Sequence, residues 1–274
     1  MERKVRDIPV YYEEVGAGRT LLMLHGWQGD HRQLFHDMES SFEQRSGWRR
    51  LYPDLPGMGR TPGADWITSQ DHMLEVVLEF LDAVAPGERF AVAGASLGAY
   101  LARGVVQKRL GQVDGVMLAA PVVATAAARQ GLPQHQVLVH DREFVSALEE
   151  DEKWLLDMIV AQSPQLLSTF RQHFKPGFDA ADLKFLEKVE AHYTFSFDVD
   201  DLPEPCAAPT LIMAGRQDAN CGYRGAWDLL DNFPRGTFAV LDRAGHVLPL
   251  EQKALYRALV SEWLDRVEEY SATG

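Results

Sequence analysis

Short, largely apolar runs alternate with stretches of helical spacing along most of this chain. The apolar runs are Leu21–Leu24, Phe90–Ala93, Val113–Ala120, Thr210–Ala214 and Phe238–Leu241. Hydrophobic residues at helical spacing lie between several of them, as in Ser69–Ala85 and Ala99–Arg109. Strands that alternate with helices form parallel sheets covered by helices. The pattern therefore predicts an α/β fold with a mostly parallel central sheet flanked by helices, preceded by a hairpin at Lys4–Val15.

The alternation stops at residues 123–202. Apolar residues there recur at helical spacing, as at Phe144 and Leu148, and strand-turn-helix repeats are absent from the sequence pattern. We expect residues 1–122 and 203–274 to form the α/β core. Residues 123–202 are then expected to form a helical insertion between two strands of that core.

A serine stands between two glycines where a predicted strand meets a predicted helix, in the segment Gly94–Gly98. A turn this sharp strains its central residue and leaves no room for side chains at the flanking glycines. Ser96 is therefore expected to present an exposed hydroxyl, with the backbone N–H of Leu97 facing any oxyanion formed beside it. This segment resembles the nucleophile elbow of the α/β-hydrolase family.

The resemblance implies roles for three further segments in the order that the family requires. The strand that ends at His25-Gly26 opens into a loop where the backbone N–H of Trp27 is the second oxyanion donor. Asp218, after the strand that begins at Thr210, is the acid that orients the catalytic histidine, and His246, after the last strand, is the general base. The order nucleophile, acid, histidine matches the family.

Each of these residues also has an ordinary structural interpretation. Glycine turns at strand ends, aspartates in tight turns and lone packed histidines are common in folded proteins. Asp242 is a rival acid because it is close to His246 in sequence, although we expect it to hold the loop. We interpret His25 as a loop-packing residue and the segment Asp54–Thr61, which is similar to a loop found in many family members, as structural.

The composition limits which binding partners and which cellular location we expect for the protein. The chain has 274 residues, 46% of them hydrophobic, and a formal net charge of −13 with no cluster of Lys or Arg. This charge argues against nucleic acid and anionic membranes as partners. The chain lacks an apolar run long enough to span a membrane and a hydrophobic signal segment, so we expect a cytoplasmic protein. The oligomeric state is not readable from the sequence.

The cysteines and histidines predict neither a disulfide nor a metal site. Cys206 and Cys221 flank a predicted strand, and at about 3.3 Å per residue their sulfurs would be too far apart for a disulfide, so we expect two free thiols. The cysteines and histidines also lack metal-binding spacing. We therefore expect no metal and no cofactor.

Substrate selection is expected to reside in the insertion, which is similar to the helical cap of the family. Its acidic run Glu149–Glu152 is interpreted as a solvated helix start rather than a site for a cationic substrate. An aromatic-rich set could line an apolar acyl or aryl pocket or could join the insertion to the core: Phe170, His173, Phe174, Phe178, Tyr193, Phe195 and Phe197.

The resemblance implies a serine hydrolase that cleaves a small carboxylic ester or related acyl compound through an acyl-serine intermediate. Serine at the elbow argues against relatives that use an aspartate nucleophile, the haloalkane dehalogenases and epoxide hydrolases. A carbon–carbon bond hydrolase or an amide hydrolase on the same triad is an alternative, although Ala95 and Leu97 depart from the residues that such relatives carry beside the serine. A ligand-binding receptor without catalysis is the alternative from another class.

Overall fold

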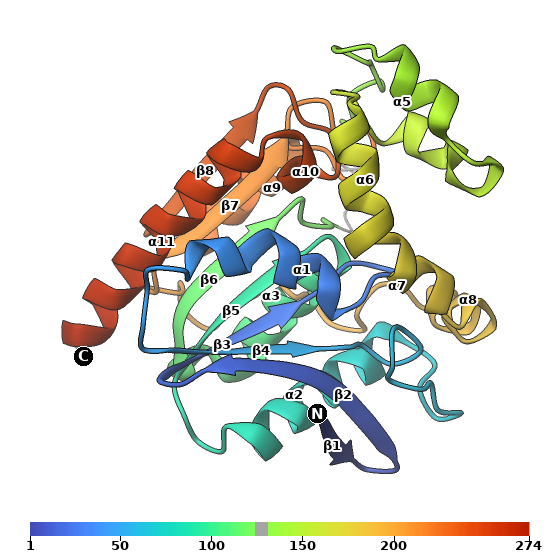
Figure 1. The fold of residues 1–274 in the computed structure, drawn as a ribbon. Coiled ribbons are helices and arrows are strands. Elements are labelled where there is room, and N and C mark those ends of the chain that lie inside the picture. The colour runs from blue at the N-terminus through green and yellow to red at the C-terminus, as the bar shows by residue number, and fades with distance from the viewer. Residues whose placement is uncertain (124–130, 274) are drawn as a thin grey trace.

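A computed structural model describes residues 1–123 and 131–273, and a sheet of eight strands forms its centre (Figure 1). The strands lie side by side in the order β1-β2-β4-β3-β5-β6-β7-β8. β1 pairs antiparallel with β2 and β2 with β4, whereas the remaining neighbours pair in parallel. The strands are β1 (Glu2–Val5), β2 (Ile8–Gly16), β3 (Arg19–Leu24), β4 (Trp48–Pro53), β5 (Phe90–Ala95), β6 (Val113–Ala119), β7 (Thr210–Gly215) and β8 (Gly236–Leu241).

Helices cover both faces of the sheet. Successive side chains of a strand point to opposite faces, and β3 follows this rule. Leu22 belongs to the buried cluster under α2 (Gln70–Val84) and α3 (Leu97–Arg109), whereas Met23 belongs to the cluster under α1 (His31–Met38) and α11 (Lys253–Thr273). The shorter helices of this part are η1 (Glu39–Ser41), η2 (Leu110–Gln112), α9 (Arg224–Asp228), η4 (Leu229–Asn232) and α10 (Leu248–Glu251).

The chain between β6 and β7 is helical in its described part. Its helices are α5 (Arg142–Ala147), η3 (Glu150–Asp157), α6 (Pro164–His173), α7 (Lys175–Ala180) and α8 (Leu183–Glu190). α5, η3 and α6 contribute to a buried cluster that includes Phe144, Leu155 and Phe170, whereas the buried residues of α8 belong to the cluster under α2 and α3. Figure 1 shows α6 lying across the end of the sheet, where it contacts α1 and α10. This segment, residues 120–209, is called the β6–β7 segment below.

The predicted fold class is confirmed, since a mostly parallel sheet is flanked by helices on both faces. The amino-terminal hairpin is present as β1 and β2. Part of the predicted insertion, residues 124–130, lies outside the described residues. Among the described helices, none combines the length and hydrophobicity needed to cross a lipid bilayer.

The interpretation of Glu149–Glu152 as a wholly solvated helix start was wrong at its last residue. Glu149 caps η3 with its side chain and its backbone N–H donates to the Glu152 carboxylate, as in a capping box. Glu152 is buried and accepts two hydrogen bonds from the Arg171 guanidinium of α6, at 2.8 and 2.6 Å. The acid therefore joins two helices of the β6–β7 segment.

Candidate active site

Ser96 occupies a strained corner between β5 and α3. Its φ is 53° and its ψ is −116°, a region that residues with a side chain rarely adopt. A Cβ added to Gly94 would lie 2.2 Å from the Gly98 carbonyl oxygen, and one added to Gly98 would lie 1.9 Å from the Leu24 carbonyl oxygen. Both glycines are therefore required by the close approach of β5, α3 and the end of β3, as the sequence predicts.

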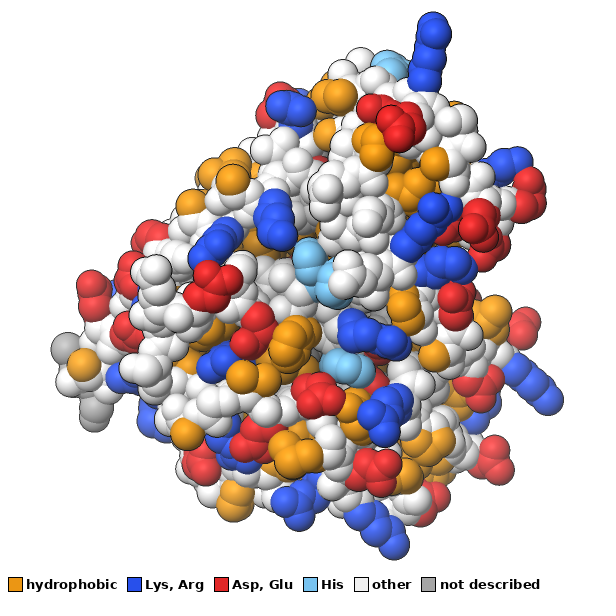
Figure 2. All heavy atoms as spheres, in the orientation of Figure 1, with side chains coloured by type: hydrophobic (Ala, Val, Ile, Leu, Met, Phe, Trp, Pro, Cys, Tyr) orange, Lys and Arg blue, Asp and Glu red, His pale blue; other side chains and the backbone are white. Residues whose placement is uncertain are grey.

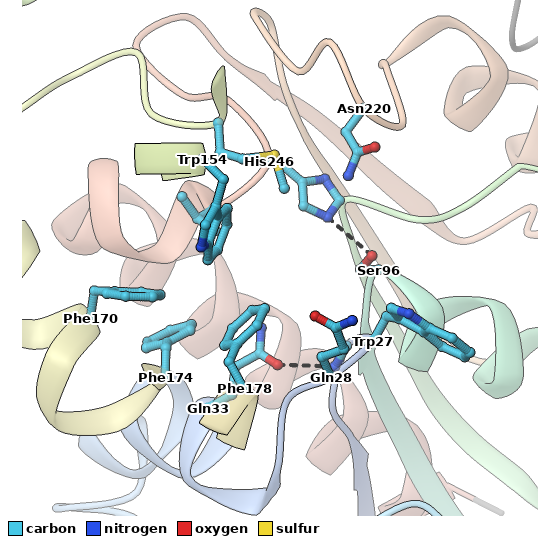
Figure 3. A pocket seen from close by; sticks show the side chains of 13 residues that line it. Trp27, Gln28, Gln33, Ser96, Trp154, Phe170, Phe174, Phe178, Asn220 and His246 are labelled. Atoms are coloured by element: carbon cyan, nitrogen blue, oxygen red, sulfur yellow. Dashed lines mark hydrogen bonds between the residues drawn. The ribbon is translucent and has the colours of Figure 1, made fainter. Parts of the chain in front are cut away.

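The structure brings Ser96, His246 and Asp218 together, although they come from three distant parts of the chain. Figure 3 shows Ser96 and His246 at the edge of the cavity. His246 Nε2 lies 3.0 Å from Ser96 Oγ, and His246 Nδ1 lies 3.0 Å from Asp218 Oδ2. The Asp218 side chain is fully buried, and its Oδ1 accepts hydrogen bonds from the backbone N–H groups of Asn220 at 2.8 Å and Cys221 at 2.9 Å. The loop after β7 thus fixes the carboxylate beside the imidazole.

Charge and burial act against each other in this cluster. Burial disfavours the imidazolium of His246, but the Asp218 carboxylate and the Cys221 side chain outweigh burial and raise the His246 pKa well above its usual value. Burial also opposes the charge of Asp218. The His246 ring and the two backbone N–H groups overcome this effect and lower the Asp218 pKa. The pair therefore favours an ionised carboxylate with a histidine of increased basicity.

The two residues whose backbone N–H groups the sequence predicts as oxyanion donors are near Ser96: Leu97 follows it directly, and Trp27 lines the same cavity. Leu97 is the first residue of α3, and the first N–H groups of a helix have no partner within that helix. Trp27 follows Gly26, whose position is so close to Ser96 that an added Cβ would lie 3.5 Å from the serine Cβ. The backbone N–H of Gly26 donates to Gln33 Oε1 of α1 at 3.0 Å, which ties the loop to that helix.

His25 and the segment Asp54–Thr61, which we interpreted as structural, stabilise the loop that carries Trp27. His25 is buried, and its Nε2 accepts a hydrogen bond from the backbone N–H of Leu55 at 2.9 Å. Its Nδ1 lies 2.8 Å from the Gly26 carbonyl oxygen, so that nitrogen carries the proton. Burial lowers the pKa of His25, which keeps the ring neutral. The buried Asp54 accepts hydrogen bonds from the backbone N–H groups of His31 at 2.7 Å and Arg60 at 2.8 Å.

A cavity of about 320 Å³ opens beside Ser96 and His246. One side is made of aromatic residues from the β6–β7 segment, and Figure 3 shows their rings facing the cavity. Among the described residues that line it, none is Asp, Glu, Lys or Arg. The lining residues are Gly26, Trp27, Gln28, Gln33, Ser96, Trp154, Met158, Phe170, Phe174, Phe178, Asn220, His246 and Val247.

The predicted aromatic set divides into two groups. Phe170, Phe174 and Phe178 line the cavity. The other four members, His173, Tyr193, Phe195 and Phe197, do not line it. The first three make ring contacts with other segments, such as the stacking of Phe195 on Tyr100 of α3, and Phe197 stacks on Phe195. Trp154 and Met158 line the cavity but were not predicted to do so. In the sequence, these two residues showed only the spacing typical of a helix. That spacing does not indicate whether a side chain faces the cavity or the core of the insertion.

The rival acid Asp242 is not the carboxylate beside His246, and the two cysteines are free thiols as the sequence predicts. Asp242 is exposed at the end of β8, whereas the carboxylate beside His246 belongs to Asp218. Cys206 is buried and Cys221 is partly buried, and both are free thiols. Cys221 is nevertheless closer to the chemistry than the sequence suggests, because its side chain interacts with the His246 ring.

Two groups of side chains within the described residues bring potential metal ligands close together. Asp218, Cys221 and His246 place one ligand atom each within 4.8 Å of one another, as do Asp30, His31 and Asp54. The first group includes the hydrogen bond from His246 to Asp218. In the second, the two carboxylates accept hydrogen bonds from backbone and side-chain donors, including Arg32 on Asp30. The carboxylates of both groups therefore already accept hydrogen bonds from protein donors.

Comparisons with known proteins agree with this architecture. A family model of the alpha/beta hydrolase family matches residues 21–259. The crystal structure of an alpha/beta superfamily hydrolase from Oenococcus oeni PSU-1 superposes with a TM-score of 0.85 and 25% identity, over 98% of this chain and 99% of that one. The chain belongs to the alpha/beta hydrolase family.

Several curated relatives have names that describe a reaction, and two of them represent the two kinds. The pimeloyl-[acyl-carrier protein] methyl ester esterase of Legionella pneumophila (strain Corby) is 22% identical, over 93% of this chain and 99% of the relative. A 2-hydroxy-6-oxononadienedioate/2-hydroxy-6-oxononatrienedioate hydrolase of Pseudomonas putida is also 22% identical, over 94% of this chain and 92% of the relative. Hydrolysis is thus the activity that the relatives share, while their substrates differ.

Proposed function

We propose that this protein is a serine hydrolase that cleaves a carboxylic ester or a related acyl compound through an acyl-serine intermediate. The observation that carries the proposal is the continuous chain of contacts from Ser96 Oγ to His246 Nε2 and from His246 Nδ1 to Asp218, at the edge of an apolar cavity. A nucleophile, a base and a group that orients the base are the three parts that acyl transfer requires.

In the proposed first half-reaction, His246 Nε2 removes the proton of Ser96 as Oγ attacks the acyl carbon. The carbonyl electron pair moves to oxygen, and the backbone N–H groups of Trp27 and Leu97 stabilise the resulting oxyanion. Asp218 stabilises the imidazolium formed on His246. The tetrahedral intermediate then collapses, the bond to the alkoxide leaving group breaks, and His246 gives that group its proton.

In the second half-reaction, water replaces the alcohol. His246 accepts a proton from water as its oxygen attacks the acyl carbon of the acyl-serine. The second tetrahedral intermediate expels Ser96 Oγ, which regains its proton from His246. The products are the carboxylic acid and the alcohol, and this sequence requires no cofactor.

The cavity favours a small, uncharged acyl or aryl group. Trp154, Phe170, Phe174 and Phe178 supply apolar contact area. None of the described residues that line the cavity has a cationic side chain that could neutralise a carboxylate on the substrate. We therefore propose a neutral ester in preference to a dicarboxylate such as the one that names the Pseudomonas putida relative.

We propose that the helical insertion, residues 123–202, acts as a cap on a core made of residues 1–122 and 203–274. The support is that Trp154, Met158 and the three cavity-lining phenylalanines come from this insertion and face Ser96 across the cavity. The net charge of −13 and the interspersed acidic and basic side chains of the face in Figure 2 argue against nucleic acid and anionic membrane as partners.

Replacement of Ser96 by alanine tests the proposal. Wild-type protein is expected to hydrolyse short 4-nitrophenyl esters and to be labelled by a fluorophosphonate probe. Ser96→Ala should lose label and lower kcat by at least about a thousandfold while remaining folded, because the triad works as a unit. Ser168→Ala, at an exposed serine of α6, is the matched control and should retain both properties.

A broader substrate panel separates the alternatives. Hydrolysis of a vinylogous diketone or an amide in preference to all esters would favour a carbon–carbon or amide hydrolase on the same residues. A wild-type protein that binds apolar ligands but neither turns over any substrate nor takes the probe would favour a receptor.

A further inference from the structure

Glu251, the last residue of α10, holds two separate loops with one carboxylate. Its Oε1 accepts hydrogen bonds from the backbone N–H groups of Val160 at 2.6 Å and Ala161 at 3.0 Å. Its Oε2 accepts one from the backbone N–H of Gly245 at 2.6 Å. Hydrogen bonds of backbone N–H groups to a carboxylate are stronger than those between neutral groups.

The first of these loops belongs to the β6–β7 segment and reaches the cavity. It follows η3, and Met158, two residues before Val160, lines the cavity. The Val160 carbonyl oxygen accepts hydrogen bonds from the backbone N–H groups of Leu138 at 2.7 Å and Val139 at 3.0 Å. A displacement of this loop would therefore move a wall of the cavity together with the chain that leads to α5.

The second loop carries the proposed base. Gly245 directly precedes His246, and the loop is anchored on its other side, where the Ala244 carbonyl oxygen accepts a hydrogen bond from the Gln217 backbone N–H at 3.0 Å. A Cβ on Gly245 would lie 2.4 Å from the Met158 carbonyl oxygen. The two loops are thus in direct backbone contact, and Glu251 joins them beside that contact.

The buried position of Glu251 disfavours the ionised form of its carboxylate. Burial raises the pKa of Glu251 and the nearby charge of Asp218 adds to the rise, while the three backbone N–H groups act in the opposite direction. A buried acid in such a position, which takes no part in the acyl-transfer steps above, is expected to serve the geometry of its neighbours.

We propose that Glu251 is a positioning residue that fixes the His246 loop and the Met158–Ala161 loop in one arrangement, so that the base and the cavity wall hold their alignment together. The inference rests on the proposed function. Glu251 is expected to affect both kcat and KM, because one loop carries the proposed base His246 and the other forms part of the wall of the cavity that holds the acyl group.

Glu251→Gln tests this role with little change of volume. An amide has a single acceptor oxygen, so at least one loop loses its acceptor and faces an NH₂ group instead. We expect kcat per active site to fall about tenfold or more and KM for an aromatic ester such as 4-nitrophenyl benzoate to rise. Glu269→Gln, at an exposed position of α11, removes the same charge and should leave both within twofold.

Active sites are counted by stoichiometric fluorophosphonate labelling before the kinetics are measured. A residue with a merely structural role would lower the labelled fraction and leave kcat and KM per labelled site unchanged, and this result would overturn the proposal. Wild-type protein that neither takes the probe nor hydrolyses an ester would instead refute the proposed function itself.

Amide hydrogen exchange on the wild-type protein keeps the test decisive if Glu251→Gln does not fold. The N–H groups of Val160, Ala161 and Gly245 are expected to exchange slowly as a set. Exchange of all three at the rates of exposed, unbonded amides would show that the carboxylate does not hold these loops and would overturn the inference.

Discussion

His36 of α1 and His173 of α6 stack with their ring centroids 4.3 Å apart and their planes 28° apart. The pair joins a helix that covers the sheet to a helix of the β6–β7 segment. Burial, the neighbouring His173 and Lys253 lower the pKa of His36 to about 4. Burial, Lys253 and Arg32 lower the pKa of His173. The folded protein therefore favours two neutral rings at this contact.

Acid should weaken the fold through this pair. In the unfolded chain His36 titrates near its usual value of about 6.5, so below that pH the unfolded state binds a proton that the folded state does not. Stability is then lost as the pH falls from about 6.5 towards 4. His36→Gln should reduce the drop in Tm between pH 7 and pH 5, measured by circular dichroism.

His140→Gln is the matched control for this prediction, because His140 is exposed. It should leave the drop in Tm unchanged. An equal drop in Tm for wild type and His36→Gln would show that the stacked pair does not contribute to acid sensitivity.

The assignment of the acid is tested by two aspartates that are close in sequence to the functional loops. Asp218→Asn should lower kcat/KM for a 4-nitrophenyl ester by about three to four powers of ten, because the amide favours the wrong tautomer of His246. Asp242→Asn should have little effect, since that side chain is exposed at the end of β8. The opposite order of effects would assign the acid to Asp242.

The pH dependence of catalysis should follow the proposed base. His246 must be neutral to accept the Ser96 proton, so kcat/KM rises with pH through the His246 pKa. Because Asp218 and Cys221 raise that pKa despite burial, the midpoint should lie above the usual value of about 6.5. A profile that is flat from pH 5 to 9 would exclude His246 as the base.

Cys221→Ala should move this midpoint to lower pH, because it removes one of the groups that raise the pKa. Cys206→Ala is the control, since Cys206 packs in the hydrophobic core. A midpoint that is identical in both variants and in wild type would mean that Cys221 does not influence the base.

The loop with the proposed oxyanion donor depends on a side chain from α1. Gln33 Oε1 accepts the hydrogen bond of the Gly26 N–H, and Gly26 directly precedes Trp27. Gln33→Ala should lower kcat by about tenfold, because a loosened loop misplaces a donor that acts only in the transition state. Gln165→Ala, at an exposed position of α6, should leave kcat unchanged. The kcat values of the two variants are compared by steady-state kinetics with the same ester.

Local sequence patterns were sufficient to predict the parallel sheet and the positions of the candidate site residues. Ser96 was predictable because two glycines and a change from strand to helix are features of neighbouring residues. Asp218 and His246 were predictable because each follows an apolar strand, and parallel strands end at one edge of a sheet. Their catalytic roles remain predictions until the variants are measured.

Contacts between distant helices could not be predicted in this way. Glu152 lies in an acidic run that is typical of a solvated helix start, and only the folding of α6 brings Arg171 to it. Trp154 has the helical spacing of a core residue, yet its ring faces the cavity. Glu251 gives no local signal for its role, because its partners Val160 and Ala161 are backbone groups about ninety residues earlier.

The separation of Ser96 and His246 by 150 residues also affects when the protein acquires reactivity. Among the described strands, β8, which leads to His246, is the last along the chain and pairs only with β7. Contacts between residues so far apart form slowly, because closing the intervening loop costs entropy. A nascent or partly folded chain can therefore hold Ser96 in its turn while lacking its proposed base, His246. Under the proposed function, reactivity towards esters is therefore withheld until the sheet is complete.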